Sequence, residues 1–144
     1  MAEKYVVILN EGMNYGIEPR KITTEEASDM LTAMEHIIGC SCTELVRPVG
    51  LKGDYAFFVD DNGHANGRNV NLFATALYTP DEVDGDTIVG KAVVVKFFRD
   101  GTTDWLDESD IEKIKKMVKE ATDRQMIAFH KLLSGGGMRT RNEE

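Results

Sequence analysis

The stretch that decides the fold is DTIVGKAVVVKFF, residues 86–98, the longest apolar run in the chain. Valine and isoleucine dominate it, as they do in a strand that is buried on both faces. Two lysines interrupt the run, and it is shorter than the roughly 18 apolar residues that a membrane span needs. We therefore predict one long strand over 86–98, in which Gly90 marks a bulge or bend.

Shorter elements precede this strand. Thr23 and Glu26 have the spacing of a capping box, and apolar residues then recur every three or four positions up to Gly39, which predicts one helix. Residues 72–78 are apolar and rich in good helix formers, so a turn or two of helix is expected there. Apolar, β-branched runs predict four further strands, at 4–10, 15–22, 42–49 and 54–60.

The last third of the chain has a helical pattern. An acidic first turn follows Asp104 or Asp107, and an apolar stripe runs from Ile111 to Leu132. A polar interruption at 122–125 leaves two alternatives open, one long helix or two consecutive helices. Three glycines at 135–137 end the pattern.

These elements predict an α+β fold with a small, mainly antiparallel sheet, one N-terminal helix and a C-terminal helical segment. A parallel βαβαβ sheet is the alternative, but the chain lacks the regular alternation of strands and helices that it requires. We expect a core domain at 1–103, a helix or helix pair at 104–134 that packs on the core or on a partner subunit, and a mobile Gly/Arg tail at 135–144.

The charge is unevenly distributed along the chain. Over 144 residues, 17 Lys and Arg stand against 25 Asp and Glu, a net charge of -8. This balance argues against a nucleic-acid polymer as the partner, because such binding needs a basic surface. Residues 113–141, however, hold 8 basic and 2 acidic groups, a local surplus of +6. An acidic body with one basic end suits a small anionic ligand.

A polar loop at 64–73 is one place where such a ligand could bind. Its amide and guanidinium groups, on Arg68, Asn69 and Asn71, can contact a nucleobase edge or a ribose. Phe73, or Trp105 further along the chain, could stack on the base. The plainer interpretation is a solvated loop whose asparagines satisfy the backbone of turns.

The C-terminal tail GGGMRTRN is the second such place. Successive glycine amides can converge on an anion, and Arg139 and Arg141 can each donate two hydrogen bonds to a phosphate. Such a tail would order when the ligand binds. The plainer interpretation is a frayed chain end.

The sequence contains no catalytic motif: no nucleophile elbow, Walker loop, dinucleotide-binding fingerprint or zinc-protease signature. Cys40 and Cys42 lack further ligands at suitable spacing, so we predict neither a metal nor a cofactor. We expect a binding protein rather than an enzyme. The first ten residues lack the apolar core of a signal peptide, which predicts a cytoplasmic protein.

The last helical segment carries both lysines and a long apolar stripe. We expect the lysines at 113, 115, 116 and 119 to form a solvated face, with ion pairs of Lys116 to Glu112 and to Glu120. The stripe exceeds what a small sheet can cover, because it also includes Met117, Met126, Phe129 and Leu133. The sequence therefore predicts a homo-oligomer, a dimer or larger, formed through this helix.

A family resemblance adds to this interpretation. IIGCSCTELVRPVG, DYAFFVDDNGHANGRNVNLFATAL and DTIVGKAVVV, within residues 37–95, resemble a small phage-encoded domain of unknown function. The shared landmarks are Gly39, the turn at 60–63, Asn69 or Asn71 before Ala74, and Ile88-Val89-Gly90. The acidic core with a helical C-terminus and tail is also similar to the phage Thoeris anti-defence sponges.

That resemblance implies a function but assigns no binding residue. It implies a non-enzymatic protein in the cytoplasm of an infected bacterium, which captures a cyclic ADP-ribose isomer and, in some members, a cyclic oligonucleotide. A different interpretation of the net charge of -8 is an acidic mimic of nucleic acid that inhibits a bacterial defence protein. A structural phage protein without a ligand is the third.

Overall fold

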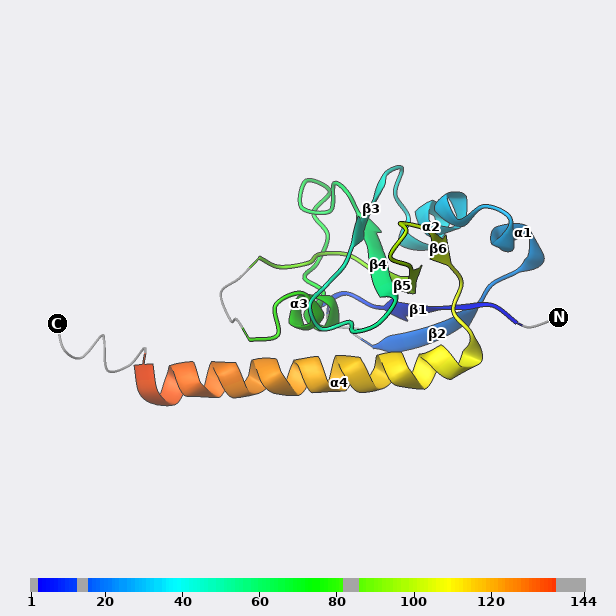
Figure 1. Ribbon diagram of the computed structural model, residues 1–144. Coiled ribbons are helices and arrows are strands. Elements are labelled where there is room, and N and C mark those ends of the chain that lie inside the picture. Colours follow the sequence, from blue (N-terminus) through cyan, green and yellow to red (C-terminus); the bar gives the residue numbers. More distant parts are fainter. Residues whose placement is uncertain (1–2, 13–15, 82–85, 137–144) are drawn as a thin grey trace.

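The computed structural model describes residues 3–12, 16–81 and 86–136. Its centre is a sheet in the order β2-β1-β5-β4-β3, with β6 paired to β5 (Figure 1). Every strand pairing among these residues is antiparallel, so the predicted α+β class is confirmed. The strands are β1 (Tyr5–Leu9), β2 (Ile17–Lys21), β3 (Thr43–Val46), β4 (Tyr55–Asp60), β5 (Ala92–Phe97) and β6 (Thr103–Asp104).

Helices cover both faces of the sheet. Those on one face are α1 (Thr24–Ala27) and α2 (Met30–Ile38), and those on the other are α3 (Leu72–Tyr78) and α4 (Glu108–Lys131) (Figure 1). A π-helical turn, η2 (Leu132–Gly136), continues α4. The bounds of α3 match the helix predicted at 72–78. No helix among the described residues is long and apolar enough to cross a membrane.

The central strands are apolar on both sides because each face of the sheet packs on helices. In β1, Val7 and Leu9 pack with the residues of α3 and α4, whereas Val6 and Ile8 pack with those of α2. The same alternation continues in β5, where Val94 faces α3 and α4. This double burial explains why these strands are almost continuous apolar runs in the sequence.

Two predicted elements differ in the structure. The strand predicted over 86–98 is shorter, because the chain bends at Gly90 (φ 81) and only Ala92–Phe97 pairs in the sheet. The helix predicted from Thr23 to Gly39 is two helices. Thr23 and Glu26 form the predicted capping box of α1, and Asp29 then accepts a hydrogen bond from the Thr32 amide and caps α2. A second capping residue inside the apolar pattern therefore divides the helix.

The C-terminal pattern forms one long helix. The polar interruption at 122–125 does not break α4. Within it, the Thr122 hydroxyl donates to the Val118 carbonyl of the preceding turn at 2.8 Å. The first half of α4 lies under the sheet, with Ile111, Ile114 and Val118 buried. Its second half extends past α3 (Figure 1).

Candidate functional site

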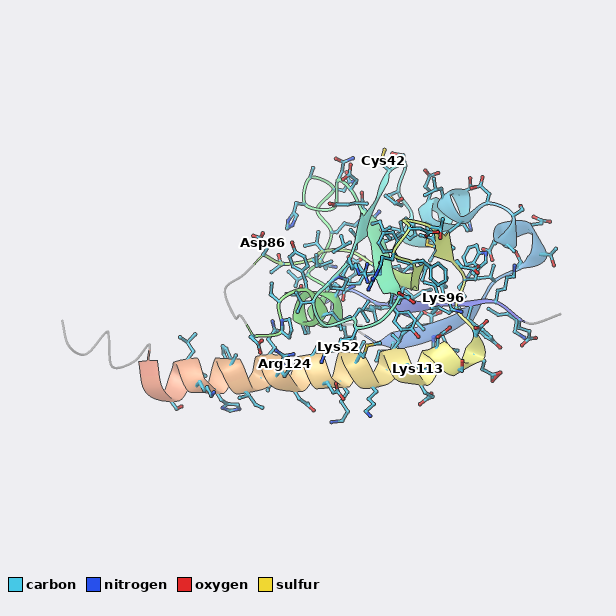
Figure 2. The ribbon with its side chains drawn as sticks, in the orientation of Figure 1. Cys42, Lys52, Asp86, Lys96, Lys113 and Arg124 are labelled. Carbon is cyan, nitrogen blue, oxygen red and sulfur yellow. The ribbon has the colours of Figure 1, made fainter. Side chains whose placement is uncertain are left out.

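A cleft of about 580 Å³ lies between the first half of α4 and the start of β4. Cavities of about 300–1,000 Å³ are typical of small-molecule sites. The turn between β3 and β4, the end of β5 and α4 each supply lysines to it. We call it the lysine cleft, and its lining includes Lys52, Lys96, Lys113 and Lys116. Figure 2 shows Lys52, Lys96 and Lys113 near the first half of α4.

The turn that carries Lys52 is held against α4. The Lys52 amide donates to the Met117 sulfur at 3.2 Å, so the backbone of this turn is tied to the helix. Its side chain stays exposed. The aromatic ring of Phe98 and the side chain of Met117 give the cleft an apolar wall beside these charges.

A buried hydrogen-bond network forms the floor of the cleft. Tyr55 donates its hydroxyl proton to Asp110 Oδ1 at 2.5 Å, and the Asp107 amide donates to Asp110 Oδ2 at 2.7 Å. The Lys96 ammonium lies 2.8 Å from Asp107 and 3.6 Å from Asp110. Both oxygens of Asp110 are thus occupied, and the charge of Lys96 is neutralised by its carboxylate partners.

The pKa values of this network follow from its geometry. Burial by itself would raise the pKa of Asp110, but the hydrogen bonds from Tyr55 and Asp107 and the charges of Lys96 and Lys113 outweigh it and lower the pKa. Burial and the bond to Asp110 raise the pKa of Tyr55. At neutral pH the pair is therefore a carboxylate and a neutral phenol.

The other three lysines of the cleft have no such partner. Lys52, Lys113 and Lys116 make no ion pair with any residue that the structure describes, although Lys113 lies within electrostatic range of Asp110. Asp54 and Glu120 also line the cleft and offset part of this charge. A cavity lined by three lysines that have no ion-pair partner among the described residues is a suitable environment for an anion.

The other two lysines of the run at 113–119 are paired with acids of α4. Lys115 pairs with Glu112 at 3.5 Å and Lys119 with Asp123 at 2.9 Å. The predicted ion pairs of Lys116 with Glu112 and Glu120 are not formed; Glu112 pairs with Lys115 instead. The lysine run therefore divides into two paired residues and two, Lys113 and Lys116, that line the cleft.

The polar loop at 64–73 is organised by one buried carboxylate at the other end of β4. Asp60 accepts hydrogen bonds from Asn66 at 2.9 Å and from Arg68 Nε at 3.1 Å. A second guanidinium nitrogen of Arg68 donates to the Gly39 carbonyl at 2.7 Å. Arg68 thus joins the loop to the end of α2. Because β4 spans about 17 Å, this loop and the lysine cleft lie at opposite ends of the strand.

Asn71 is fully buried and caps α3. Its side-chain oxygen accepts from the Ala74 amide at 2.9 Å, and its amide nitrogen donates to the carbonyls of Leu9 and Gly90, both at 2.8 Å. These bonds tie the start of α3 to β1 and to the bend before β5. Because Asn71 is fully buried and both of its amide protons are donated to the backbone, it holds the fold together and is not accessible to a ligand.

The other predicted site residues lie apart from one another. Trp105 is 5% exposed on the α1–α2 side of the core, and its indole N–H donates to the Ala27 carbonyl at 3.3 Å, so its ring faces protein. Phe73 is half-buried on the opposite face. Asn69 is exposed beside Glu11, which accepts its backbone amide. Arg139 and Arg141 lie outside the described residues.

The predicted site residues that the structure describes, Arg68, Asn69, Asn71, Phe73 and Trp105, therefore do not line one cavity. The residues that do line a basic cavity come from a turn, a strand and a helix that are far apart in the sequence. The charge surplus within 113–141 and the spacing of Lys113 and Lys116 were the available signals. The sequence alone could not place Lys52 and Lys96 beside Lys113 and Lys116, because their proximity depends on the packing of α4 on the sheet.

A family model, the domain of unknown function DUF3846, matches residues 6–119. The chain belongs to this family. The matched region of the DUF3846 domain extends from β1 into α4 and includes all four lysines of the cleft. No curated protein and no solved structure matches the chain. Among the described residues, no group of three or more His, Cys, Asp or Glu side chains is arranged to hold a metal ion.

Proposed function

We propose that this DUF3846 protein binds a small anionic nucleotide in the lysine cleft and sequesters it without cleaving it. The observation that supports this proposal is that three lysines, Lys52, Lys113 and Lys116, line one cavity and form no ion pair with a described residue. Phosphate oxygens would accept their hydrogen bonds, and Phe98 and Met117 would contact the base or ribose.

The chemistry of the cleft favours binding over hydrolysis. Asp110 is the buried carboxylate of the cleft, and both of its oxygens already accept hydrogen bonds. Tyr55 donates its proton to that carboxylate, so neither group is positioned to remove a proton from a ligand or from water. A bound nucleotide would therefore be retained unchanged.

The biological setting is part of the same proposal. The likeness to phage Thoeris anti-defence sponges suggests a cyclic ADP-ribose isomer or a cyclic oligonucleotide as the ligand, bound in the cytoplasm of an infected bacterium. Such ligands carry two or more phosphates on a compact ring, which matches the size and charge of the lysine cleft. In this proposal the tail with Arg139 and Arg141 would add further phosphate contacts.

Isothermal titration of the full chain with glycocyclic ADP-ribose and with a cyclic trinucleotide tests the proposal. We expect Lys116→Glu to weaken binding about tenfold or more, since one charge-assisted hydrogen bond contributes about 1.5–3 kcal/mol. The matched control is Lys119→Glu, which makes the same charge change on the paired side of α4 and should leave binding within about twofold.

Each outcome of the titration distinguishes a part of the proposal. If neither nucleotide releases heat with the folded protein, nucleotide binding is rejected. If Lys119→Glu weakens binding as much as Lys116→Glu does, the cleft is not the site. If Arg139→Ala with Arg141→Ala leaves the affinity unchanged, the tail takes no part. Mass spectrometry of the released ligand must show an unchanged mass, because a cleaved product contradicts sequestration.

A second candidate function is supported by a second cavity. Glu44, Asp61 and Asp86, three exposed acidic residues, line a cavity of about 440 Å³ that also includes Asp60. An acidic mimic of nucleic acid would use such a surface to bind a basic defence protein. In that case Glu44→Lys with Asp61→Lys would abolish inhibition of the partner, whereas Lys116→Glu would not.

A further inference from the structure

The second half of α4 carries an apolar surface that the rest of the described chain leaves exposed. Hydrogen bonds from Arg124 to Asp81 and from Gln125 to Thr79 tie this part of the helix to the body. Figure 1 shows α4 continuing beyond α3. We call residues 126–134 the arm. Its large apolar side chains remain 44–56% exposed, namely Met126, Ile127, Phe129, Leu132 and Leu133.

Most of the arm continues the stripe that packs under the sheet. At 100° per residue, Met126, Phe129, Leu132 and Leu133 lie on the same side of the helix as Val118, which is buried. Only Ile127 lies on the other side. An amphipathic stripe that is buried in its first half and exposed in its second half indicates a partner for the second half.

Beside the arm lies an apolar groove of about 500 Å³. Val70, Leu72 and Phe73 form its wall on the body, and Met126 and Phe129 form its wall on α4. Leu72 is 52% exposed and Val70 is 42% exposed. One protomer therefore presents both a concave apolar surface and, one helical turn further along, a projecting apolar one.

The charges indicate which partner suits these surfaces. The charge of Arg124 is neutralised by Asp81 of its own chain. The arm beyond it, 126–134, carries Lys131 and no acidic residue, although the net charge of the chain is -8. Asp86, which is exposed, immediately precedes Thr87 in the lining of the groove. A basic apolar arm and an acidic body with an apolar groove complement one another, and a second copy of this chain supplies both.

We propose that two copies exchange arms about a two-fold axis. Leu132 and Leu133 of each copy would occupy the groove of the other copy. On α4 the groove ends at Phe129, one helical turn before Leu133. For each arm tip to reach the groove of the other copy, the two α4 helices would run antiparallel and cross near Phe129. This contact is isologous and closed, so it ends at a dimer. It does not depend on the ligand.

Sedimentation equilibrium of the full chain tests this arrangement. We expect a dimer in the wild type. Leu133→Glu on the arm and Leu72→Glu in the groove should each raise the dissociation constant about tenfold or more, because a carboxylate would be buried in an apolar contact. Ile127→Glu is the matched control, since it is as exposed as these residues and lies on the other side of α4. It should leave the dissociation constant unchanged.

A mixing experiment separates arm exchange from other dimers. A pair of one Leu133→Glu copy and one Leu72→Glu copy retains one intact arm in one intact groove. The equimolar mixture should therefore dimerise more tightly than either variant alone. A mixture as weak as the single variants would overturn the exchange and favour arm-to-arm packing. A monomeric wild type at every concentration, or an Ile127→Glu variant that dissociates like Leu133→Glu, would overturn the proposal altogether.

Discussion

Glu26 illustrates how one side chain joins two elements of this fold. It accepts the Thr23 amide in the capping box of α1, and it also accepts two hydrogen bonds from Arg20 on β2, at 3.1 and 2.9 Å. The bonds from Arg20 come first among the causes that lower its pKa from 4.5 to about 2. Because the folded state stabilises the ionised form of the Glu26 carboxyl group, ionisation of Glu26 favours folding.

The stability that Glu26 contributes should therefore depend on pH. It is fully present above about pH 4.5 and is lost as the pH falls towards about 2. Glu26→Gln keeps the cap but removes the charge, and we expect it to lower the free energy of unfolding at pH 7 by about 1–2 kcal/mol after allowance for solvent screening. Urea denaturation at several pH values measures this difference, which should vanish in acid.

Glu25→Gln provides the control for this experiment. Glu25 is an exposed neighbour in the first turn of α1 and forms no ion pair with a described residue. Its substitution should change the free energy of unfolding by less than about 0.5 kcal/mol. A Glu26→Gln variant with the same pH dependence as the wild type would show that the ion pair with Arg20 does not stabilise the fold.

At the scale of elements, α3 packs closely against the turn after β3, backbone to backbone. The Gly50 amide donates to the Leu77 carbonyl at 2.8 Å. A Cβ atom at Gly50 would lie 2.9 Å from the Leu77 carbonyl oxygen and 3.1 Å from its Cα. Both atoms belong to the backbone of Leu77 in α3, so they cannot move aside as the end of a flexible side chain would.

We therefore expect Gly50→Ala to lower the free energy of unfolding by about 1–3 kcal/mol, as overpacking does elsewhere. Thermal or urea denaturation followed by circular dichroism measures it. Gly16→Ala is the matched control, because nothing lies within 4 Å of its added Cβ. That variant should be neutral or slightly more stable. An unchanged Gly50→Ala protein would mean that α3 shifts freely relative to the turn.

For the whole molecule, the two proposed binding surfaces lie along one helix. The first half of α4 lines the lysine cleft, and the second half carries the arm. The two halves also differ in burial, since Ile114 and Val118 are buried, whereas Phe129 and Leu133 are close to half exposed. One continuous helix thus connects a core-forming segment to a projecting one.

This difference predicts how hydrogen exchange of the amides depends on protein concentration. Amides near Ile114 and Val118 should exchange slowly at every concentration, because they belong to the core. Amides between Met126 and Leu133 should exchange quickly in dilute protein and more slowly in concentrated protein, because the dimer covers them. Hydrogen–deuterium exchange with mass spectrometry measures both. Protection of the arm that is independent of concentration would contradict arm exchange.

The sequence was informative wherever local chemistry decides the structure. The capping box of Thr23 and Glu26, the helix over Leu72–Tyr78 and the antiparallel α+β class were all predicted. These features depend on neighbouring residues and on apolar periodicity, which the sequence displays directly. The prediction of one strand over 86–98 was wrong in its bounds, since a positive φ at Gly90 turns the first part of that run away from the sheet.

The roles of the predicted site residues depended on distant parts of the chain. Asn71 and Trp105 have the chemistry of ligand contacts, yet their polar atoms are satisfied by Leu9, Gly90 and Ala27, which lie 19 to 78 positions away. The chemical groups of a side chain determine which partners it can bind, but its neighbours in the folded structure determine which partner it does bind. Lys116 is exposed, as the predicted solvated run requires, but its place on the lysine cleft follows only from the packing of α4.

The distribution of charge, the helical C-terminus and the class of fold thus follow from the order of residues alone, because charge and periodicity are local properties. The tertiary structure decided which charges stay unpaired. Lys115 and Lys119 meet acids on their own helix, whereas Lys113 and Lys116 line a cleft together with Lys52 and Lys96. That cleft exists only because α4 packs beneath β4 and β5, through contacts between residues more than fifty positions apart.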